Sequence, residues 1–432
     1  MDGGIFGAFS PAGRNRRMRG TGCDRADEPL QLNLPVSPTL SPPQIGDLLV
    51  LIATLLTQFV IGWLYFRDWR RKMPPLAARL SLVVLSILGT ITAFNSLSML
   101  TRYRGRNLPG AVRGIIEAVG LTWGVGSLAS LCIYFVFRYL ARQLPAEFST
   151  ERRGLIRAAG ATAMAAPFAF FAYGGFVERT RFEVREVDLP VPNLHPDLEG
   201  IRIAQISDLH VSPFLSVREA ARVVDMTNEL RPHLTMVTGD LISERGDPLD
   251  ETIRELARLR AEAGVLGCMG NHEYYARCQN YTEHETAKVG ITFLRNQARQ
   301  FRWGQGVLNV GGVDFQATKD KYKYLSRSAS LVVRDAERPV TNLLLSHNPD
   351  VFPVAVRQGW DAVLSGHTHG GQVTMEILNQ GINPARFVTP FVAGLYRIDG
   401  RSCYVNAGIG TIGMPVRLGA PPEISLFRLK RA

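Results

Sequence analysis

The sequence is poor in cysteine, with five residues in 432. One lies in the N-terminal tail and one in an apolar stretch, which leaves only Cys268, Cys278 and Cys403 for a soluble part. These three cysteines form no disulfide framework, and their spacing is not that of a zinc finger. The second half also lacks a basic run interleaved with aromatic residues, so no nucleic-acid partner is expected.

Charge is distributed unevenly along the chain. Residues 1–199 hold 22 Lys and Arg against 15 Asp and Glu, whereas residues 200–432 hold 27 against 23. The larger basic excess flanks apolar stretches, where positive charge sets membrane orientation and meets anionic headgroups. The basic pI therefore points to a membrane rather than to nucleic acid.

The first half of the chain predicts a membrane region. Residues 1–44 lack periodicity and predict a disordered tail of unassigned role. Within residues 45–177, four uncharged apolar stretches are each long enough to span a bilayer as a helix, so we expect three to four transmembrane helices. The alternative is a set of buried core helices in a soluble domain. The stretches are Leu48–Phe66, Leu80–Thr101, Ala118–Phe137 and Ala158–Val177.

Basic residues between these stretches predict the orientation. With four spans, residues 67–79 and 138–154 share one side and hold nine Lys and Arg, whereas residues 102–114 and 178–187 share the other and hold seven. The positive-inside rule then places the first pair in the cytoplasm. We expect a multi-pass protein of the inner (cytoplasmic) membrane whose second half lies outside the cytoplasm.

The second half predicts an α/β domain. A polar connector is expected over residues 178–199, and the domain over residues 200–432. Short apolar runs alternate with helical patterns such as Val217–Leu230, and Arg295–Phe315 predicts two strands around a Gly-rich turn. This rhythm and the β-rich end are typical of a layered α/β sandwich.

Five polar motifs each follow a short apolar run. Ligands sit where the strands of open α/β sheets end, so we expect these side chains to converge. Two Asp, one Asn and several His suit two divalent cations, and two metals supply what phosphate-ester hydrolysis needs. Asp240 suits a bridging role because a carboxylate has two oxygens. The motifs are Ser-Asp208-Leu-His210, Gly-Asp240, Gly-Asn271-His272-Glu273, Ser-His347-Asn and Gly-His367-Thr-His369.

These motifs, in this order and spacing, resemble those of the calcineurin-like metallophosphoesterase family over about residues 199–430. The run Gly366–Gln372 and the C-terminal pattern from Gly408 to Glu423 are similar to the membrane-attached bacterial branch of that family. The resemblance implies a four-layer α/β/β/α metallophosphoesterase sandwich after the transmembrane helices.

The resemblance also implies residue roles and two divalent metal ions, which could be Mn, Fe or Zn. A hydroxide between the metals would attack phosphorus, and His272 would act as the general acid. Glu273 would orient His272, or else merely cap a helix or face solvent. Arg417 could contact a substrate phosphate or pack the C-terminal loop. The implied ligands are Asp208, His210, Asp240 and His369 for one metal, and Asp240, Asn271, His347 and His367 for the other.

The predicted function is a membrane-anchored, metal-dependent phosphoric ester hydrolase. It would cleave phosphodiester or pyrophosphate bonds, in a lipid or envelope substrate. Members of the membrane-attached branch hydrolyse UDP-2,3-diacylglucosamine in the cytoplasm, a reaction that an outward-facing domain would contradict. A UDP-2,3-diacylglucosamine pyrophosphatase, a nuclease and a non-catalytic metal-binding scaffold or sensor stay open as alternatives. The sequence assigns neither the physiological substrate nor the oligomeric state.

Overall fold

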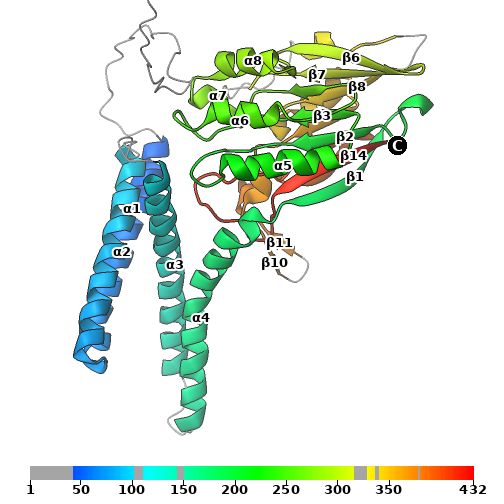
Figure 1. Ribbon diagram of the computed structural model, residues 1–432. Helices are drawn as coiled ribbons and strands as arrows, with labels where there is room; N and C mark the ends of the chain where they lie inside the picture. Colours follow the sequence, from blue (N-terminus) through cyan, green and yellow to red (C-terminus); the bar gives the residue numbers. More distant parts are fainter. Residues whose placement is uncertain (1–41, 102–109, 144–149, 316–327, 336–339, 378–379) are drawn as a thin grey trace, which may run out of the picture.

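The computed structural model describes residues 42–101, 110–143, 150–315, 328–335, 340–377 and 380–432. Residues 1–41 of the predicted tail lie outside this range. Four long helices precede an α/β domain (Figure 1), as predicted. They are α1 (Pro42–Leu64), α2 (Pro75–Thr101), α3 (Gly110–Arg142) and α4 (Thr150–Phe176).

The four helices form a bundle that projects from one end of the domain (Figure 1), and each is long and apolar enough to cross a membrane. Many of their apolar side chains are exposed, among them Phe59, Val84 and Val136. A soluble protein rarely exposes so large an apolar surface. The alternative of core helices in a soluble domain is therefore disfavoured, and the helices support association with a membrane.

Two six-stranded sheets form the centre of the domain. The strand order is β1-β14-β2-β3-β4-β5 in the first sheet and β12-β13-β9-β8-β7-β6 in the second. The first contains β1 (Glu183–Val191), β2 (Arg202–Ile206), β3 (Leu234–Val237), β4 (Val265–Gly267), β5 (Ile291–Phe293) and β14 (Glu423–Arg431). The second contains β6 (Gln297–Trp303), β7 (Gly306–Gly312), β8 (Val340–Leu345), β9 (Ala362–Ser365), β12 (Gly394–Ile398) and β13 (Arg401–Val405). A separate hairpin joins β10 (Met375–Ile377) and β11 (Gln380–Ile382).

Three apolar layers hold the domain together. Ile203 and Leu345 belong to the layer between the two sheets. Val223 and Ile253 belong to a second layer beneath the helices that cover the first sheet, and Phe352 belongs to a third beneath α10. The domain thus has the predicted α/β/β/α order. Its helices are α5 (Val217–Glu229), α6 (Leu249–Leu256), α7 (Asn271–Tyr275), α8 (Gln279–Lys288) and α10 (Phe352–Gln358).

Residues 178–199, expected as a polar connector, contain strand β1. This strand pairs in parallel with β14 at the edge of the first sheet, and its Leu189 and Val191 are buried. The strand also carries four charged residues. An edge strand keeps one side toward solvent, so its apolar pattern is weak and it resembles a linker in sequence. The domain therefore begins before residue 200.

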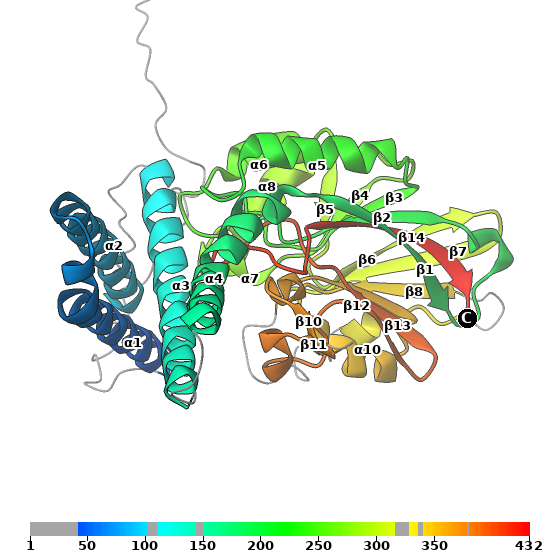
Figure 2. The same ribbon diagram turned by 90° about the horizontal axis from the view of Figure 1, so that it is seen from below.

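The membrane bundle packs directly on the domain (Figure 2). In the last turn of α4, Gly174 lies against Val416 and Leu418, and its carbonyl accepts a hydrogen bond from Arg417 N at 3.2 Å. A Cβ at Gly174 would lie 2.7 Å from Val416 Cγ1, so only glycine permits this approach. Near the start of α3, Gly114 faces Pro213 in the same way. Two helices thus contact loops of the domain.

Candidate metal centre

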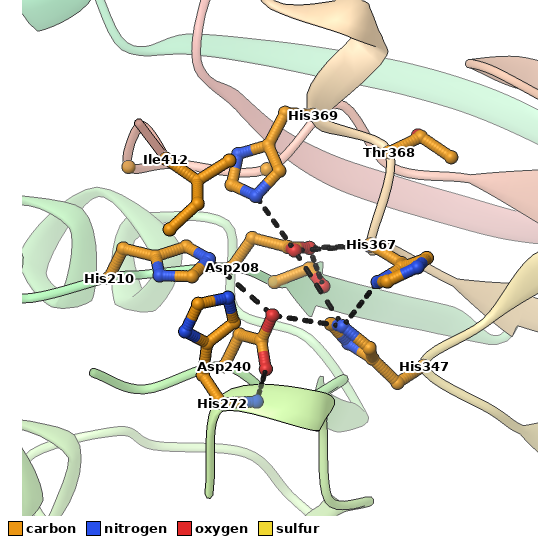
Figure 3. A network of polar contacts seen from close by, with 12 residues as sticks. Asp208, His210, Asp240, His272, His347, His367, Thr368, His369 and Ile412 are labelled. Carbon is orange, nitrogen blue, oxygen red and sulfur yellow. Dashed lines mark hydrogen bonds and ion pairs between the residues drawn. The ribbon is translucent and has the colours of Figure 1, made fainter. Parts of the chain in front are cut away.

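The predicted site residues meet at one end of the two sheets (Figure 3). Parallel strands β2, β3 and β4 of the first sheet and β8 and β9 of the second end there, so the loops that follow them converge. The structure brings all seven predicted metal ligands together with His272. Asp208 and His210 follow β2, Asp240 follows β3, Asn271 and His272 begin α7 after β4, His347 follows β8, and His367 and His369 follow β9.

Asp240 lies at the centre of the cluster. Its Oδ2 is 3.4 Å from His210 Nε2 and 3.0 Å from His347 Nε2. Its Oδ1 accepts a hydrogen bond of 2.8 Å from the main-chain N of His272. Imidazoles on both sides of one carboxylate are consistent with the predicted bridging role.

Asp208 forms a second centre of contacts. Its Oδ1 lies 3.3 Å from His369 Nε2, and its Oδ2 accepts a hydrogen bond of 2.6 Å from Ser207 Oγ. The main-chain N of His367 donates to both carboxylate oxygens, at 3.1 and 3.0 Å. Asn271 Oδ1 lies 3.0 Å from His347 Nε2 on the other side of the cluster.

Three groups of side chains could each hold a cation, with ligand atoms within 4.8 Å of one another. Two of the groups fall within the two ligand sets that the family resemblance implies, whereas the third contains His272. The groups are Asp208, His210 and His369; Asp240, His347 and His367; and His210, Asp240 and His272.

The residues present fit divalent cations. His210 Nε2 is buried, faces Asp240 and has no hydrogen-bond partner among the described residues. A buried polar atom without a partner costs about 1–3 kcal/mol, and a bound cation would relieve that cost. Carboxylates and imidazoles together suit Mn, Fe or Zn, and which metal binds depends on availability as well as affinity.

The electrostatics of the cluster favour added positive charge. Burial by itself lowers the pKa of His347, but Asp240 and Asp208 outweigh burial and raise this pKa to about 10. Burial lowers the pKa of His367 to about 4 and that of His369 to about 3. These two imidazoles are therefore neutral at pH 7, which is the form that binds metal.

Five of the predicted ligands have strained backbones. Positive φ angles are uncommon outside glycine and cost of order 1–3 kcal/mol each, and they cluster at functional sites. Close packing around these residues holds them in their strained conformations. A Cβ on Gly366, for example, would lie 2.0 Å from Ser207 Oγ and 2.2 Å from Asp208 Oδ2. The strained ligands are Asp208 (51°), His210 (46°), Asp240 (57°), His367 (74°) and His369 (53°).

Glu273 differs from the expectation that it orients His272. It is fully buried, and its carboxylate accepts hydrogen bonds from the main-chain N of Leu241 (2.7 Å), Gly270 (2.8 Å) and Asp240 (3.1 Å). None of these three contacts involves the His272 ring. Glu273 thus caps the start of α7, one of the alternatives stated for it, and does not face solvent. It also fixes the loop that carries Asp240 to the loop that carries Asn271.

The His272 ring has a polar contact with Ser243, which the sequence did not reveal. His272 Nδ1 contacts the main-chain O of Ser243, and Ser243 Oγ lies 3.1 Å from His210 Nδ1. Contacts of this kind fix the tautomer and orientation of an imidazole. No motif marks Ser243, because a main-chain carbonyl carries no sequence signature.

Arg417 packs the C-terminal loop, one of the two alternatives stated for it. Its side chain is fully buried, and its guanidinium donates hydrogen bonds to the carbonyls of Gly408, Gly410 and Ala420. These hydrogen bonds give Arg417 a structural role in the C-terminal loop.

Comparisons with known proteins identify the family of the domain. Residues 201–371 match the model of the calcineurin-like phosphoesterase family. A transmembrane protein with a metallophosphoesterase domain from Danio rerio is 30% identical over 261 residues, which cover 58% of each chain. An uncharacterized metallophosphoesterase from Campylobacter jejuni is 30% identical over 253 residues, which cover 57% of this chain and 63% of the relative. The chain thus spans less than two thirds of either relative.

Among solved structures, phosphopantetheinyl hydrolase from Mycobacterium tuberculosis matches with 15% sequence identity and a TM-score of 0.33. The match covers 49% of this chain and 91% of that one. The family match, the metallophosphoesterase relatives and the clustered ligands lead to one conclusion: the second half of this chain is a calcineurin-like metallophosphoesterase domain.

Proposed function

We propose that this protein is a membrane-anchored, two-metal phosphoesterase that hydrolyses a phosphodiester or pyrophosphate bond in an amphiphilic substrate. One observation carries the proposal: the bundle docks on the loops that surround the metal centre. Pro213, which faces Gly114 of α3, follows His210 by three positions. A substrate embedded in the bilayer would therefore have its phosphate near the site.

The loop that packs on α4 also forms a wall of the metal centre. Its Val416 contacts Gly174, whereas its Gly410 N donates a hydrogen bond of 2.7 Å to Asp208 O. Between them, the partly exposed Ile412 lies beside His210 and His369 (Figure 3). An apolar side chain at the rim suits a substrate with an apolar portion.

Other exposed apolar side chains support contact with lipid. Tyr275 is 67% exposed, and its ring centroid lies 5.4 Å from that of His272. Phe387 and Val388 are 94% and 86% exposed, and they follow the β10–β11 hairpin, which extends beneath the sheets on the side of the bundle (Figure 1). Exposed apolar residues at the level of a membrane interface are typical of partial insertion.

Different residues of the chain have different roles in the proposed reaction. When bound, two divalent cations would supply a nucleophile from water at neutral pH and neutralise the phosphoryl charge. Asp240 holds its carboxylate between the two ligand groups. In the protonated ring, Nδ1–H would donate to Ser243 O, which leaves Nε2–H to give its proton to the leaving oxygen. Burial lowers the pKa of His272, which makes its protonated form a stronger acid.

The proposed orientation places the catalytic domain outside the cytoplasm. Strand β1 follows α4 closely, whereas the basic segment Arg70–Lys72 lies beyond the opposite end of the bundle (Figure 1). The positive-inside rule then assigns the basic end to the cytoplasm. This orientation supports a phospholipid or an envelope-polymer phosphoester over a nucleotide-linked lipid of the cytoplasmic leaflet.

The test is the hydrolysis of bis-p-nitrophenyl phosphate by the detergent-purified full chain, with and without manganese. We expect manganese-dependent turnover that Asp240→Ala abolishes together with metal content. Asp188→Ala is the matched control, because this exposed carboxylate forms a surface ion pair with Arg428, at 3.3 Å. Turnover without metal, or full metal content in Asp240→Ala, would contradict the proposal.

A second assay addresses the amphiphilic substrate. Phospholipids in mixed micelles should be cleaved with a higher kcat/KM than a water-soluble diester of the same headgroup. Equal kcat/KM values for the two substrates would contradict the amphiphilic substrate, but they would not contradict the phosphoesterase activity.

A further inference from the structure

We propose that Arg113, in the membrane helix α3, is a positioning residue for His272, and that it acts through the segment Ser243–Asp247. This inference rests on the proposed function, because it concerns the same reaction. The transmembrane bundle would then be part of the support of the active site as well as an anchor.

The first link joins the helix to the domain. Arg113 lies near the start of α3, at the end that meets the domain. Its Nη1 is 2.6 Å from Glu244 Oε1, and its Nη2 is 3.8 Å from Asp247 Oδ1. All three side chains are mostly shielded from solvent. Ion pairs shielded from water are stronger than those at an open surface.

The second link runs from Asp247 to Ser243. Asp247 Oδ2 accepts hydrogen bonds from the main-chain N of Ser243 at 3.0 Å and of Glu244 at 2.8 Å. Asp247 N in turn donates to Glu244 O at 3.2 Å. Burial raises the pKa of Asp247 to about 6, and Arg113 is among the groups that oppose this rise. Arg113 thus helps to keep this carboxylate ionised and able to hold the segment.

The third link reaches the site itself. The main-chain O of Ser243 contacts His272 Nδ1, and its Oγ lies 3.1 Å from His210 Nδ1. The two imidazole rings are neighbours, with centroids 4.6 Å apart. A displacement of Ser243 would therefore turn His272 away from the position in which its Nε2 faces the substrate.

The segment is joined to the domain at both ends, and α3 supports the part between them. Leu241 N donates to Glu273 Oε1, and Ile242 forms a bridge with Val211. At the far end, the main-chain O of Asp247 accepts a hydrogen bond of 2.8 Å from the buried Leu249, where α6 begins. Between these attachments, Glu244 and Asp247 form ion pairs with Arg113, so a membrane helix adds a support that the domain's own sheets do not provide.

The test uses the full chain in detergent and two diesters, one with a good leaving group (p-nitrophenol) and one with a poor one (phenol). Arg113→Gln should lower kcat for the phenyl ester about 10- to 100-fold, the range for loss of a residue that orients a site group. The loss should be smaller for the p-nitrophenyl ester, while KM and metal content stay unchanged. Arg113→Lys should recover part of the rate, because it keeps the charge.

Two further variants separate positioning from a general structural role. Arg142→Gln, at the opposite end of the same helix, should behave as the unaltered protein. In Arg113→Gln/His272→Ala, the losses should not add, because the first change misplaces the proton donor that the second removes. Asp247→Asn tests the second link from within the domain, and it should show the same leaving-group dependence as Arg113→Gln. It therefore provides the test even if Arg113→Gln fails to fold.

The outcomes separate the two proposals. Equal losses for both esters, fully additive losses in the double variant, or an Arg113→Gln protein as fast as the unaltered one would overturn the positioning role alone. Absence of metal-dependent turnover by the unaltered protein with either ester would overturn the proposed function, and the positioning role with it.

Discussion

Replacement of Glu273 by alanine tests whether this residue holds the site together or takes part in catalysis. Its carboxylate accepts hydrogen bonds from three buried main-chain N–H groups, those of Leu241, Gly270 and Asp240. A buried donor left without a partner costs about 1–3 kcal/mol, so three such donors cost about 3–9 kcal/mol. Domains are commonly stable by only about 5–15 kcal/mol, so this loss would be severe.

Thermal unfolding in detergent measures the effect. A domain of this size loses about 2–4 °C in Tm for each kcal/mol, so Glu273→Ala should lower Tm by at least about 6 °C. Metal content should fall as well, because the loop that carries Asp240 loses its support. Glu285→Ala is the matched control, since Glu285 forms a surface pair with Lys288 at 2.7 Å and such pairs contribute about 0–1 kcal/mol.

The alternative is that Glu273 orients His272, one of the two roles that the sequence left open. In that case, Glu273→Ala would keep its Tm and metal content but lose turnover, chiefly for substrates with poor leaving groups. This result would refute the structural role derived from the three hydrogen bonds.

Three further predictions concern other parts of the site. His272→Ala should keep the metals and the Tm but lose about 10²–10⁴-fold in kcat, most for poor leaving groups, and an equal loss for all leaving groups would contradict its role as a general acid. Gly366→Ala should lower Tm and metal content, because the new Cβ collides with Ser207 and Asp208, at a cost of about 1–3 kcal/mol; an unchanged metal content would show that Asp208 can move without consequence. Burial raises the pKa of Asp247 from 3.8 to about 6, so the stability linked to its protonation is fully present below pH 3.8 and is lost as the pH rises through about 6. Relative to Asp247→Asn, the Tm of the unaltered protein should therefore fall between pH 4 and pH 7, and parallel Tm profiles for the two proteins would contradict the raised pKa.

Much of the fold could be predicted because its signals are local. The four apolar stretches have the length of a membrane span, and helices occur over all of them. The pair of strands predicted within Arg295–Phe315 is present as β6 and β7. Strand β1 was missed because its partner is β14, near the other end of the chain, and because an edge strand with charged residues has no strong apolar pattern.

The sequence by itself determined which residue types gather at the site, since Asp, Asn and His follow apolar runs, and the carboxyl ends of parallel strands lie at the same edge of a sheet. Tertiary structure alone decided what supports them. Glu273 binds main-chain groups of two loops, Ser243 meets His272 through a carbonyl, and Arg113 reaches the segment that contains Ser243 from a membrane helix. Main-chain atoms and contacts between segments distant in the chain have no signature in the order of residues. They exist only once the helices and sheets have packed.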